Sequence, residues 1–505
     1  MRGPHNFWRL IRTGATFERA GAMKVALEAM NAPRSVRIVA RIIGWPVQWL
    51  GLRGDPDQPP VLRALTALGP AYIKFGQLMS TRPDVVGAEL AQDLRILQDA
   101  LPPFDTAIAK AEVEKELGLT IDEMFESFSE PVAAASLAQV HKAVVRETGQ
   151  VVAVKVLRPG IERAFMRDVD AFFLAAGIIE VFAPFSRRLR PRAVIEHFAG
   201  IVRGELDLRM EASAADEFAH NTKGDTGFSV PALIWELSAR RVLTTEWVDG
   251  VPLGDVAAIL ATGQDPAEFA TRILQTFLRH ALRDGFFHGD MHQGNLKRAP
   301  NGDLVAFDFG IMGRIDTYTR RAYAEILMGF LRRDYRRVAE VHFEAGYVPA
   351  DQDIAAFAQA LRSVGEPIFD YDASQVSMGR LFAHLFDVTE QFGMQTRTEL
   401  ILLQRTMLVV EGVARTLSED INMWDASAPV IETYIRDNIG PKAVLRDTMT
   451  TLKVLARFGP RLPELAESAL LNLNKTPETP ARFNGLIWGL AGVALGLGVA
   501  MIVVL

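Results

Sequence analysis

Two short motifs in the middle of the chain carry the residue types that phosphoryl transfer requires. The run HGDMHQGN occupies residues 288–295, and the run DFG occupies residues 308–310. Asp290 could accept the proton of an attacking hydroxyl, while Asn295 and Asp308 could supply oxygen ligands to magnesium. An acid, an amide and a second acid thus follow one another in the order that phosphoryl transfer from ATP uses. We take ATP chemistry as the leading hypothesis.

The residues around these motifs need rigid elements to hold them. The apolar run LVAF at 304–307 leads directly into Asp308 and predicts a short buried strand, whose end would hold a metal ligand firmly. Upstream, the β-branched run VVAVK at 151–155 is similar to the strand of protein kinases whose lysine grips the α- and β-phosphates of ATP and pairs with a glutamate on a helix. We therefore expect Lys155 to bind phosphate.

A further segment between these motifs suits the hinge that joins the two lobes of a kinase. Residues 243–250 read LTTEWVDG, a strand-like run that ends in a glycine turn. The backbone of such a hinge would meet the adenine of ATP. The hinge residues expected to do so are Glu246 and Val248.

The loop ahead of Lys155 departs from the protein-kinase pattern. Protein kinases carry G-x-G-x-x-G there, and the glycines let backbone N–H groups approach the phosphates. Residues 131–141 of this chain read PVAAASLAQVH, with alanine in place of glycine, and each Cβ atom restricts positive φ. The residues expected to lie over the phosphates are Ala133, Ala134, Ala135 and Ser136.

Taken together, these motifs resemble those of the UbiB family of atypical kinase-like proteins, the aarF-domain proteins required for ubiquinone biosynthesis. The most specific parts of the resemblance are KFGQ at 74–77, AAAS at 133–136 and ELD at 205–207, and the likeness covers roughly residues 60–340. It implies a two-lobed, protein-kinase-like α+β fold and an N-terminal helical extension whose KxGQ segment folds over the active site. It also implies ATP binding with ATPase activity, little ordinary protein-kinase activity, and membrane association.

The resemblance assigns a role to each matching residue of the kinase-like site. Lys155 matches the phosphate-gripping lysine, and Glu205 matches its ion-pair partner. Asp290 matches the catalytic-loop acid, and Asn295 and Asp308 match the ligands of Mg²⁺.

The resemblance also assigns roles to the regulatory motifs. Lys74 and Gln77 match the KxGQ motif of the extension, Asp207 belongs to the ExD motif, and Glu211 matches the acid that receives Lys74. Without the resemblance, Asp207 and Glu211 would read as a solvated helix face, since they are one turn apart.

Length and composition agree with a large chain of several parts. At 505 residues the chain is long enough for more than one domain or for one domain with extensions. It contains no cysteine, which excludes disulfides and thiolate metal sites. The expected parts are an N-terminal helical extension at 1–125, a kinase-like N-lobe at 126–247, a helical C-lobe at 248–480 and a transmembrane helix at 484–505.

Charge is unevenly distributed along the chain. Residues 1–53 hold nine Lys and Arg against two Glu, although the net charge of the whole chain is −6. This basic segment contains Phe7, Trp8, Trp45 and Trp49. Two interpretations remain open: the segment lies on an anionic membrane surface, or it forms a helical hairpin docked on the kinase-like body.

The C-terminal run predicts a membrane anchor. Residues 485–505 carry no charge, and a helix of this length, at about 1.5 Å per residue, can cross a hydrocarbon core of about 30 Å. Lys475 and Arg482 precede the run, so the positive-inside tendency predicts that the catalytic body lies in the cytoplasm, anchored to the inner membrane by one helix. Glycines spaced four residues apart in the run permit a homodimer or a partner helix.

Three functions from different classes follow from these observations. The first is an ATP-hydrolysing kinase-like enzyme that acts on or near lipid quinone precursors. The second is a small-molecule or lipid kinase, because HGDxHxGN also resembles the catalytic loop of aminoglycoside and choline phosphotransferases. The third is a nucleotide-gated scaffold for other membrane-bound enzymes of ubiquinone biosynthesis. No dinucleotide fingerprint or haem-ligand pattern supports direct hydroxylation of a quinone, and no nucleic-acid module is visible.

Overall fold

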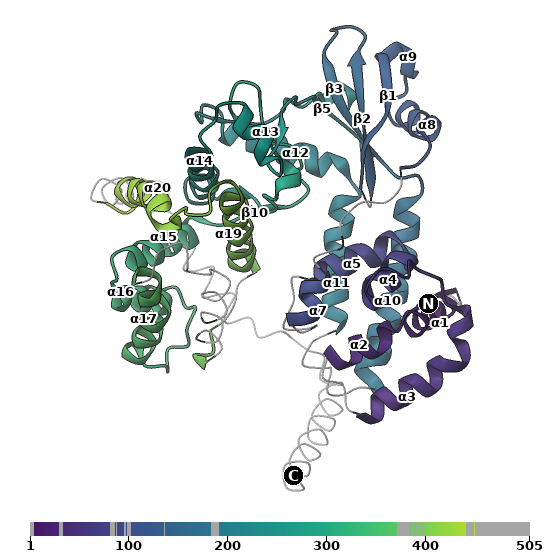
Figure 1. Cartoon of the computed structure of the whole chain (residues 1–505), viewed down its shortest axis with the longest axis horizontal. Helices are drawn as coiled ribbons and strands as arrows, with labels where there is room; N and C mark the ends of the chain where they lie inside the picture. The colour runs from purple at the N-terminus through teal and green to yellow at the C-terminus, as the bar shows by residue number, and fades with distance from the viewer. Residues whose placement is uncertain are drawn as a thin grey trace, which may run out of the picture. The chain divides into compact units, whose positions relative to one another are not determined.

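The computed structural model of the chain (Figure 1) describes most of residues 5–440. Within that range it leaves out residues 30–33, 81–85, 87, 95–96, 98–102, 136, 183–190, 371–383, 385–387, 389–390 and 395–397, and beyond it only residue 449 is described. The chain divides into two compact units, residues 1–432 and 433–505. The expected transmembrane segment 484–505 lies outside the described residues. Within the described part, no helix is both long and apolar enough to cross a membrane.

The N-terminal extension is helical, as the resemblance implied. Its elements are α1 (His5–Arg19), α2 (Ala22–Ala29), α3 (Arg34–Gly44), η1 (Trp45–Leu50), α4 (Pro60–Leu68), α5 (Pro70–Ser80), α7 (Ala88–Leu94), α8 (Thr106–Leu117) and α9 (Ile121–Met124). Gly69 separates α4 from α5 with a φ of 105°, a value that side chains rarely tolerate, and Pro70 starts the next helix.

An antiparallel sheet of four strands follows, in the order β1-β2-β3-β5. Its strands are β1 (Phe125–Ala134), β2 (Ala138–Val145), β3 (Val151–Leu157) and β5 (Val242–Glu246). In β3, Val152, Val154 and Val156 are fully buried in one core, while Lys155 points to the other face because side chains alternate along a strand. The predicted VVAVK strand is therefore confirmed.

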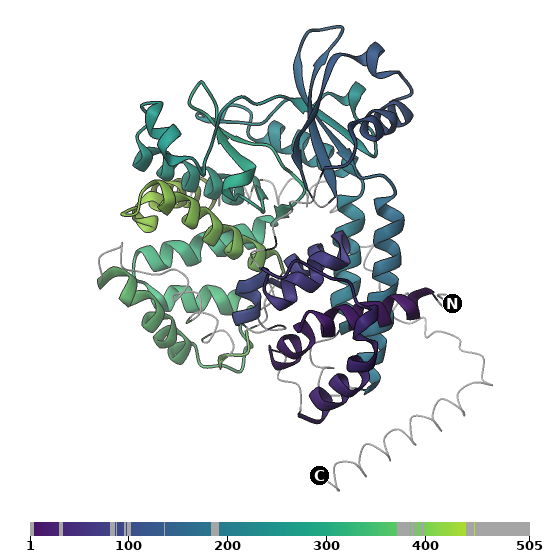
Figure 2. The same ribbon diagram turned by 45° about the vertical axis from the view of Figure 1, so that its right-hand side comes forward.

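Three helices connect β3 to β5: α10 (Ile161–Phe182), α11 (Pro191–Glu205) and α12 (Leu208–Asn221). The helices α10 and α11 run side by side, and α5 lies against them (Figures 1 and 2). Aromatic rings form this contact: Phe75 of α5 packs edge-on against Phe198 of α11, with ring centroids 5.3 Å apart, and against Phe172 of α10 at 5.1 Å. The extension is thus packed on the same helices that lead to the acids of the site.

The second lobe is built around two small sheets and a set of helices. One sheet has the order β4-β9-β8-β6, and the other pairs β7 with β10. The strands are β4 (Phe228–Ser229), β6 (Val251–Pro252), β7 (Phe286–His288), β8 (Leu296–Arg298), β9 (Leu304–Ala306) and β10 (Met312–Arg314). The helical elements are α13 (Val256–Ala261), α14 (Pro266–Arg279), the π-helix η4 (His280–Asp284), η5 (Gln293–Asn295), α15 (Thr317–Leu331), α16 (Tyr335–Glu344), α17 (Ile354–Asp370), α19 (Thr398–Leu417) and α20 (Met423–Asn438). The short helix η3 (Trp235–Leu237) precedes β5 and packs in the core of the first sheet.

The core of this lobe surrounds the strands that carry the catalytic motifs. Phe287 of β7 and Leu296 of β8 are fully buried and belong to one apolar cluster with α14 and α19. The strand predicted ahead of Asp308 is present as β9, and all three of its residues are buried. The catalytic motifs therefore begin or end at strands anchored in a packed core.

Candidate active site

One lysine and two acids meet where the two lobes adjoin. The Nζ atom of Lys155 on β3 lies 2.8 and 2.9 Å from the two carboxylate oxygens of Glu211, and 3.2 Å from Oδ2 of Asp308. Glu211 lies in the first turn of α12, and Asp308 follows β9. The fold thus brings together three charged side chains that are far apart in the sequence.

The pKa of each residue in this cluster is shifted by a charge on another. Burial alone would lower the pKa of Lys155, but the negative charges of Asp308 and Glu211 outweigh it and raise that pKa. Burial would likewise raise the pKa of Asp308, but the positive charge of Lys155 and a backbone N–H from Gly310 lower it. For Glu211, burial and the nearby Asp308 charge raise the pKa against the pull of Lys155. Lys155 is therefore a permanent cation, suited to binding phosphate.

The start of α12 fixes where Glu211 lies. Asp207 is the N-cap of this helix, and its carboxylate accepts the backbone N–H of Arg209 at 3.2 Å and the Arg209 side chain at 2.9 Å. An N-cap satisfies a donor that the first turn leaves without a partner. Asp207 of the ExD motif therefore sets the helix start one turn before Glu211.

The two acids of the regulatory motifs have exchanged the partners that were expected. Glu205 does not pair with Lys155. Its Oε2 atom lies 3.0 Å from the Nζ atom of Lys74, and Glu211 takes Lys155 in its place. The assignments of Glu205 to Lys155 and of Lys74 to Glu211 were wrong. The physical reason is the break between helices. Glu205 ends α11, against which α5 packs, whereas Glu211 lies inside α12, which packs on β5 and reaches Lys155 of the neighbouring strand β3.

The rest of the KxGQ motif also makes specific contacts. The Gln77 side chain donates from Nε2 to the backbone carbonyl of Leu97 at 3.1 Å. At Gly76, a Cβ atom would come within 2.5 Å of Leu97 and 2.7 Å of Leu65, so the glycine permits close packing of α5. The lysine thus holds α5 to Glu205, whereas the glycine and the glutamine both bring it against Leu97.

The catalytic loop holds Asp290 through its backbone. The N–H group of Asp290 donates to Nδ1 of His288 at 3.0 Å, and Asn295 donates from Nδ2 to the Asp290 carbonyl at 3.0 Å. The carboxylate of Asp290 remains one-quarter exposed, with Nε2 of His292 at 3.5 Å. Asp290 and Asn295 therefore lie together, as the spacing predicted, and the Asp290 carboxylate is accessible to a substrate.

The hairpin of β8 and β9 brings Asn295 and Asp308 to the same end. The N–H of Phe307 donates to the Asn295 carbonyl at 3.3 Å, directly beyond the last paired residues of the hairpin. The Asp308 side chain keeps 43% of its surface exposed. A carboxylate and an amide oxygen are hard ligands that suit Mg²⁺, which takes few protein ligands and completes its shell with phosphates and water. The residues thus fit a magnesium ion bound together with a nucleotide.

No richer metal site competes with this one in the described part of the chain. Among the described residues, no group of three or more His, Cys, Asp or Glu side chains could hold a metal ion.

The alanine loop forms the turn between β1 and β2, where a phosphate-binding loop is expected. Ala133 and Ala134 end β1, and the N–H of Ala135 donates to the Ala138 carbonyl at 2.8 Å. Arg158 donates from Nε and Nη2 to the Ala135 carbonyl at 3.2 and 3.0 Å. The position of Ser136 lies outside the described residues. Arg158, which no sequence motif marked, therefore holds the tip of this loop by hydrogen bonds.

In the predicted hinge, the backbone groups of Glu246 and Val248 both make hydrogen bonds. The Glu246 N–H donates to the Ala232 carbonyl at 2.8 Å, and Lys297 donates from Nζ to the Val248 carbonyl at 3.2 Å. Lys297 also lies over the ring of Trp247, 5.5 Å from its centroid. The segment is thus an ordered connection between β5 and the second lobe.

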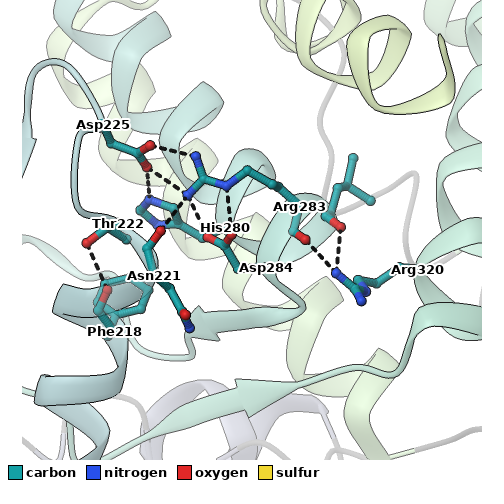
Figure 3. A network of polar contacts seen from close by, with 9 residues as sticks. Phe218, Asn221, Thr222, Asp225, His280, Arg283, Asp284 and Arg320 are labelled. Atoms are coloured by element: carbon teal, nitrogen blue, oxygen red, sulfur yellow. Dashed lines mark hydrogen bonds and ion pairs between the residues drawn. The ribbon is translucent and has the colours of Figure 1, made fainter. Parts of the chain in front are cut away.

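A buried polar network connects the end of α12 to the strand that leads into the catalytic loop (Figure 3). Asp225, just beyond α12, accepts from Nε2 of His280 at 3.0 Å and from Arg283 at 2.6 Å. Burial would raise the pKa of Asp225, but these two donors lower it. Arg320 adds a hydrogen bond to the Arg283 carbonyl at 2.5 Å. The network fixes the π-helix η4, which β7 follows, against the helix that carries Glu211.

The helix α19 supports the catalytic loop from the other side. The hydroxyl of Thr406 lies 3.0 Å from the Gly289 carbonyl, and the side chain of Gln293 donates to the Thr416 hydroxyl at 3.1 Å. Sequence reasoning missed both threonines, because a single threonine in an apolar helix carries no motif. It also missed His288 as the acceptor for the Asp290 N–H, although this histidine belongs to the HGD run.

Comparison with known proteins now decides the family. The model of the ABC1 atypical kinase-like domain matches residues 96–342, and that of the UbiB helical domain matches residues 361–422. A protein of Marinobacter nauticus named probable protein kinase UbiB is 36% identical over 83% of this chain and 77% of its own length. Proteins of the same name from Aeromonas hydrophila and Shewanella piezotolerans are 37% and 38% identical, over 87% and 82% of this chain and 82% and 77% of their own. This chain belongs to the UbiB family.

A solved structure supports the fold of this UbiB-family protein. The complex of Rv3197 with erythromycin from Mycobacterium tuberculosis aligns with a TM-score of 0.53 at 22% identity, and covers 79% of this chain and 98% of that one. At this identity the likeness concerns the fold alone. The UbiB helical domain contains α19, so the two threonines join that domain to the catalytic loop of the ABC1 domain.

Proposed function

We propose that this UbiB-family protein is an atypical kinase-like ATPase that binds Mg-ATP between its two lobes and supports ubiquinone biosynthesis at the membrane. The observation that carries the proposal is the cluster of Lys155, Glu211 and Asp308 beside the loop that holds Asp290 and Asn295. Every polar group that turnover requires is present and held by backbone or side-chain contacts. This favours an active enzyme over an inert relative.

Each residue has one task in this proposal. Lys155, held by Glu211, would bind the phosphates of ATP, and Asp308 and Asn295 would hold Mg²⁺, which neutralises charge on the phosphates when bound. Asp290 would accept the proton of the attacking water as the oxygen bonds to the terminal phosphorus. The products of that step are ADP and inorganic phosphate. If a hydroxyl of a lipid or small molecule replaced the water, the same residues would perform a kinase reaction.

The extension supports a preference for substrates other than proteins. Lys74 and Glu205 fix α5 beside the junction of α11 and α12, one short segment away from Glu211. A helical segment held there would restrict the approach of a folded protein substrate. We propose that lipid quinone precursors, such as polyprenylphenols, are the molecules near which ATP is hydrolysed.

The membrane context rests on the sequence of the C-terminal segment. We propose that residues 484–505 form a single transmembrane helix in the inner membrane and that the catalytic body lies in the cytoplasm. Membrane lipids would then be constant neighbours of the protein. Other enzymes of ubiquinone biosynthesis, or a second copy through the spaced glycines, would be its protein partners.

Assays of the detergent-solubilised full chain test the function. ATP turnover would be followed with and without lipid vesicles and a soluble polyprenylphenol mimic, with free phosphate and phosphorylated mimic measured separately. Release of free phosphate, abolished by Asp290→Asn, is the expected result. Phosphorylated mimic would favour the small-molecule or lipid kinase, and nucleotide binding without either product would favour the nucleotide-gated scaffold.

A further inference from the structure

Two polar side chains lie in the apolar core of the four-stranded sheet. Gln139 and His141 are alternate residues of β2, and both are 0% exposed. In the sheet they stand opposite Val156 and Val154 of β3, on the face away from Lys155. Buried polar groups need hydrogen-bond partners. The partners of this pair connect β2 to the start of α8 and to β1.

The side-chain amide of Gln139 holds the backbone of Phe104. The Phe104 N–H donates to Oε1 of Gln139 at 2.9 Å, and Nε2 of Gln139 donates to the Phe104 carbonyl at 3.2 Å. Phe104 directly precedes Asp105, the N-cap of α8, whose carboxylate accepts the Ala107 N–H at 2.7 Å. Gln139 therefore sets the point at which the chain enters α8, beside the first sheet (Figure 1).

His141 fixes the orientation of this amide. Its Nδ1 atom lies 2.8 Å from the Ser129 carbonyl, and its Nε2 atom lies 2.9 Å from Nε2 of Gln139. A carbonyl oxygen only accepts, so Nδ1 carries the hydrogen and Nε2 of the neutral ring accepts from Gln139. Burial lowers the pKa of His141, which favours this neutral form. Both amide hydrogens of Gln139 are thus used, one for His141 and one for Phe104.

Phe104 connects this pair to the alanine loop. Its ring centroid lies 5.7 Å from Cζ of Arg158, within the range of a cation–π contact. Arg158 in turn holds the Ala135 carbonyl. Arg241 adds a second connection, because it donates from Nη2 to the Arg158 carbonyl at 2.9 Å while its Nε atom lies 2.7 Å from Oε1 of Glu112 in α8. The start and the middle of α8 therefore both support Arg158.

We propose that Gln139 and His141 are positioning residues of the nucleotide site. They hold Phe104 against Arg158, so that Arg158 keeps the alanine loop in the shape that selects between ATP and ADP. Apolar residues at the two positions would fill the same core but would bind neither polar group of Phe104. The inference rests on the proposed function for the identity of the nucleotide, whereas the route from Gln139 to Ala135 stands on contacts within the protein alone.

The test compares two glutamine substitutions in the detergent-solubilised full chain. Gln139→Met keeps the length of the side chain and removes its polar atoms. The matched control is Gln275→Met, because Gln275 on α14 also donates from Nε2 to a backbone carbonyl, that of Ala426, at 3.0 Å. Hydrogen exchange would be measured at the amides of positions 104 and 135, on peptides that contain them. Titration would give the affinities for ADP and for a non-hydrolysable ATP analogue.

Gln139→Met should speed exchange at both amides and shift the ratio of ATP-analogue to ADP affinity severalfold, whereas Gln275→Met should do neither. Phe104→Leu keeps the backbone bonds to Gln139 and removes the ring. It should leave the amide at position 104 protected, yet speed exchange at Ala135 and shift the affinity ratio in the same direction as Gln139→Met.

A protected amide at position 104 in Gln139→Met would overturn the proposal. So would unchanged exchange at Ala135 together with an unchanged affinity ratio in either variant. If Gln139→Met does not fold, Phe104→Leu alone decides by the same criterion. A wild-type protein that binds no nucleotide would contradict the proposed function, while exchange at Ala135 would still decide whether Gln139 and Phe104 position the loop.

Discussion

The Nζ atom of Lys74 lies 3.0 Å from Oε2 of Glu205, and the two side chains are only 17% and 10% exposed. Glu205 is the last residue of α11, and after a break of two residues α12 begins and carries Glu211 to Lys155. The ion pair therefore links the N-terminal extension to the end of the helix that precedes α12, which carries the partner of Lys155.

A double-mutant cycle on Lys74 and Glu205 should reveal strong coupling. Removing one partner leaves the other charge largely buried, which typically costs about 3 kcal/mol. Lys74→Ala and Glu205→Ala should each lower the free energy of unfolding, and the double variant should cost less than the sum of the two. Urea titration of the four proteins measures the coupling, and the ATPase rate of each measures its effect on the site.

The matched control for this cycle pairs Lys74 with Glu211. Because Glu211 binds Lys155 and not Lys74, the effects of Lys74→Ala and Glu211→Ala should add. Coupling between Lys74 and Glu211 together with additivity between Lys74 and Glu205 would show that the ion pairs rearrange in solution.

The sequence predicted which residues lie near one another better than it predicted which charged residues pair. Asp290, Asn295 and Asp308 lie where their motifs indicated, because each motif is local and is held by the strands next to it. The pairing of two lysines with two glutamates is different. Glu205 and Glu211 are only six residues apart in the sequence, and the break between α11 and α12 decides which lysine each one contacts. That break is not encoded by periodicity, although the N-cap at Asp207 is a signal that could have located it.

Long-range supports of the site were beyond the reach of the sequence. Thr406 is more than a hundred residues from Gly289, and Arg158 reaches back over twenty residues to the alanine loop. Such contacts arise from packing between elements, and no local pattern marks them. The basic N-terminal segment was intermediate: its composition was visible in the sequence, but the exposure of Trp45 and Trp49 was not.

The substitution Asp308→Asn should strongly weaken magnesium-dependent ATP binding. It keeps the shape of the side chain but removes the charge that faces Lys155 and would face Mg²⁺. Affinity for Mg-ATP should fall at least tenfold, which corresponds to about 1.4 kcal/mol. Calorimetric titration with and without magnesium measures the change. Asp303→Asn, in the turn between β8 and β9, is the control and should bind normally; equal loss in both variants would point to damage of the hairpin.

Loosening the alanine loop should change its nucleotide preference. Ala135→Gly removes a Cβ atom and allows positive φ at the tip of the loop, so the ratio of ATP to ADP affinity should shift and autophosphorylation should appear. Arg158→Gln should act in the same direction, because Arg158 holds the Ala135 carbonyl. Nucleotide titration and radiolabel incorporation report both effects. If both variants keep wild-type affinities, this loop does not contact the phosphates.

Acid should destabilise the protein through its buried histidines. Burial lowers the pKa of His342 from 6.5 to about 4, so the unfolded chain takes up a proton at a higher pH than the folded chain does. The free energy of unfolding should therefore fall as the pH drops from about 6.5 to about 4. At about 1.4 kcal/mol per pH unit, His342 accounts for roughly 3 kcal/mol of that loss. His141, His280 and His288 also have pKa values lowered by burial and add to it.

Urea titrations across this pH range measure how steeply the free energy of unfolding falls with pH. In His342→Gln the fall should be smaller than in the wild type, whereas His220→Gln, which replaces an exposed histidine at the end of α12, should leave it unchanged. An identical slope in His342→Gln and wild type would mean that the ring of His342 is reached by water in the folded protein.

The contact between Thr406 and Gly289 should matter for turnover and not for nucleotide binding. The Thr406 hydroxyl has one hydrogen, which it shares between the Gly289 carbonyl at 3.0 Å and the Leu402 carbonyl at 2.8 Å. Thr406→Val keeps the shape but removes the donor, and a buried carbonyl without a donor costs about 1–3 kcal/mol. The catalytic loop should relax around Asp290, which follows Gly289 directly. We expect kcat to fall about tenfold or more, which corresponds to about 1.4 kcal/mol of activation free energy.

Steady-state kinetics separate this effect from a general loss of structure. The KM for ATP should stay within about twofold, because the cluster of Lys155, Glu211 and Asp308 is not touched, and Thr406→Ser, which retains the hydroxyl, should restore kcat. A rise in KM with unchanged kcat would place the effect on the nucleotide site. Wild-type kcat in Thr406→Val would show that the hydroxyl serves the Leu402 carbonyl within its own helix, and that α19 supports the catalytic loop through packing alone.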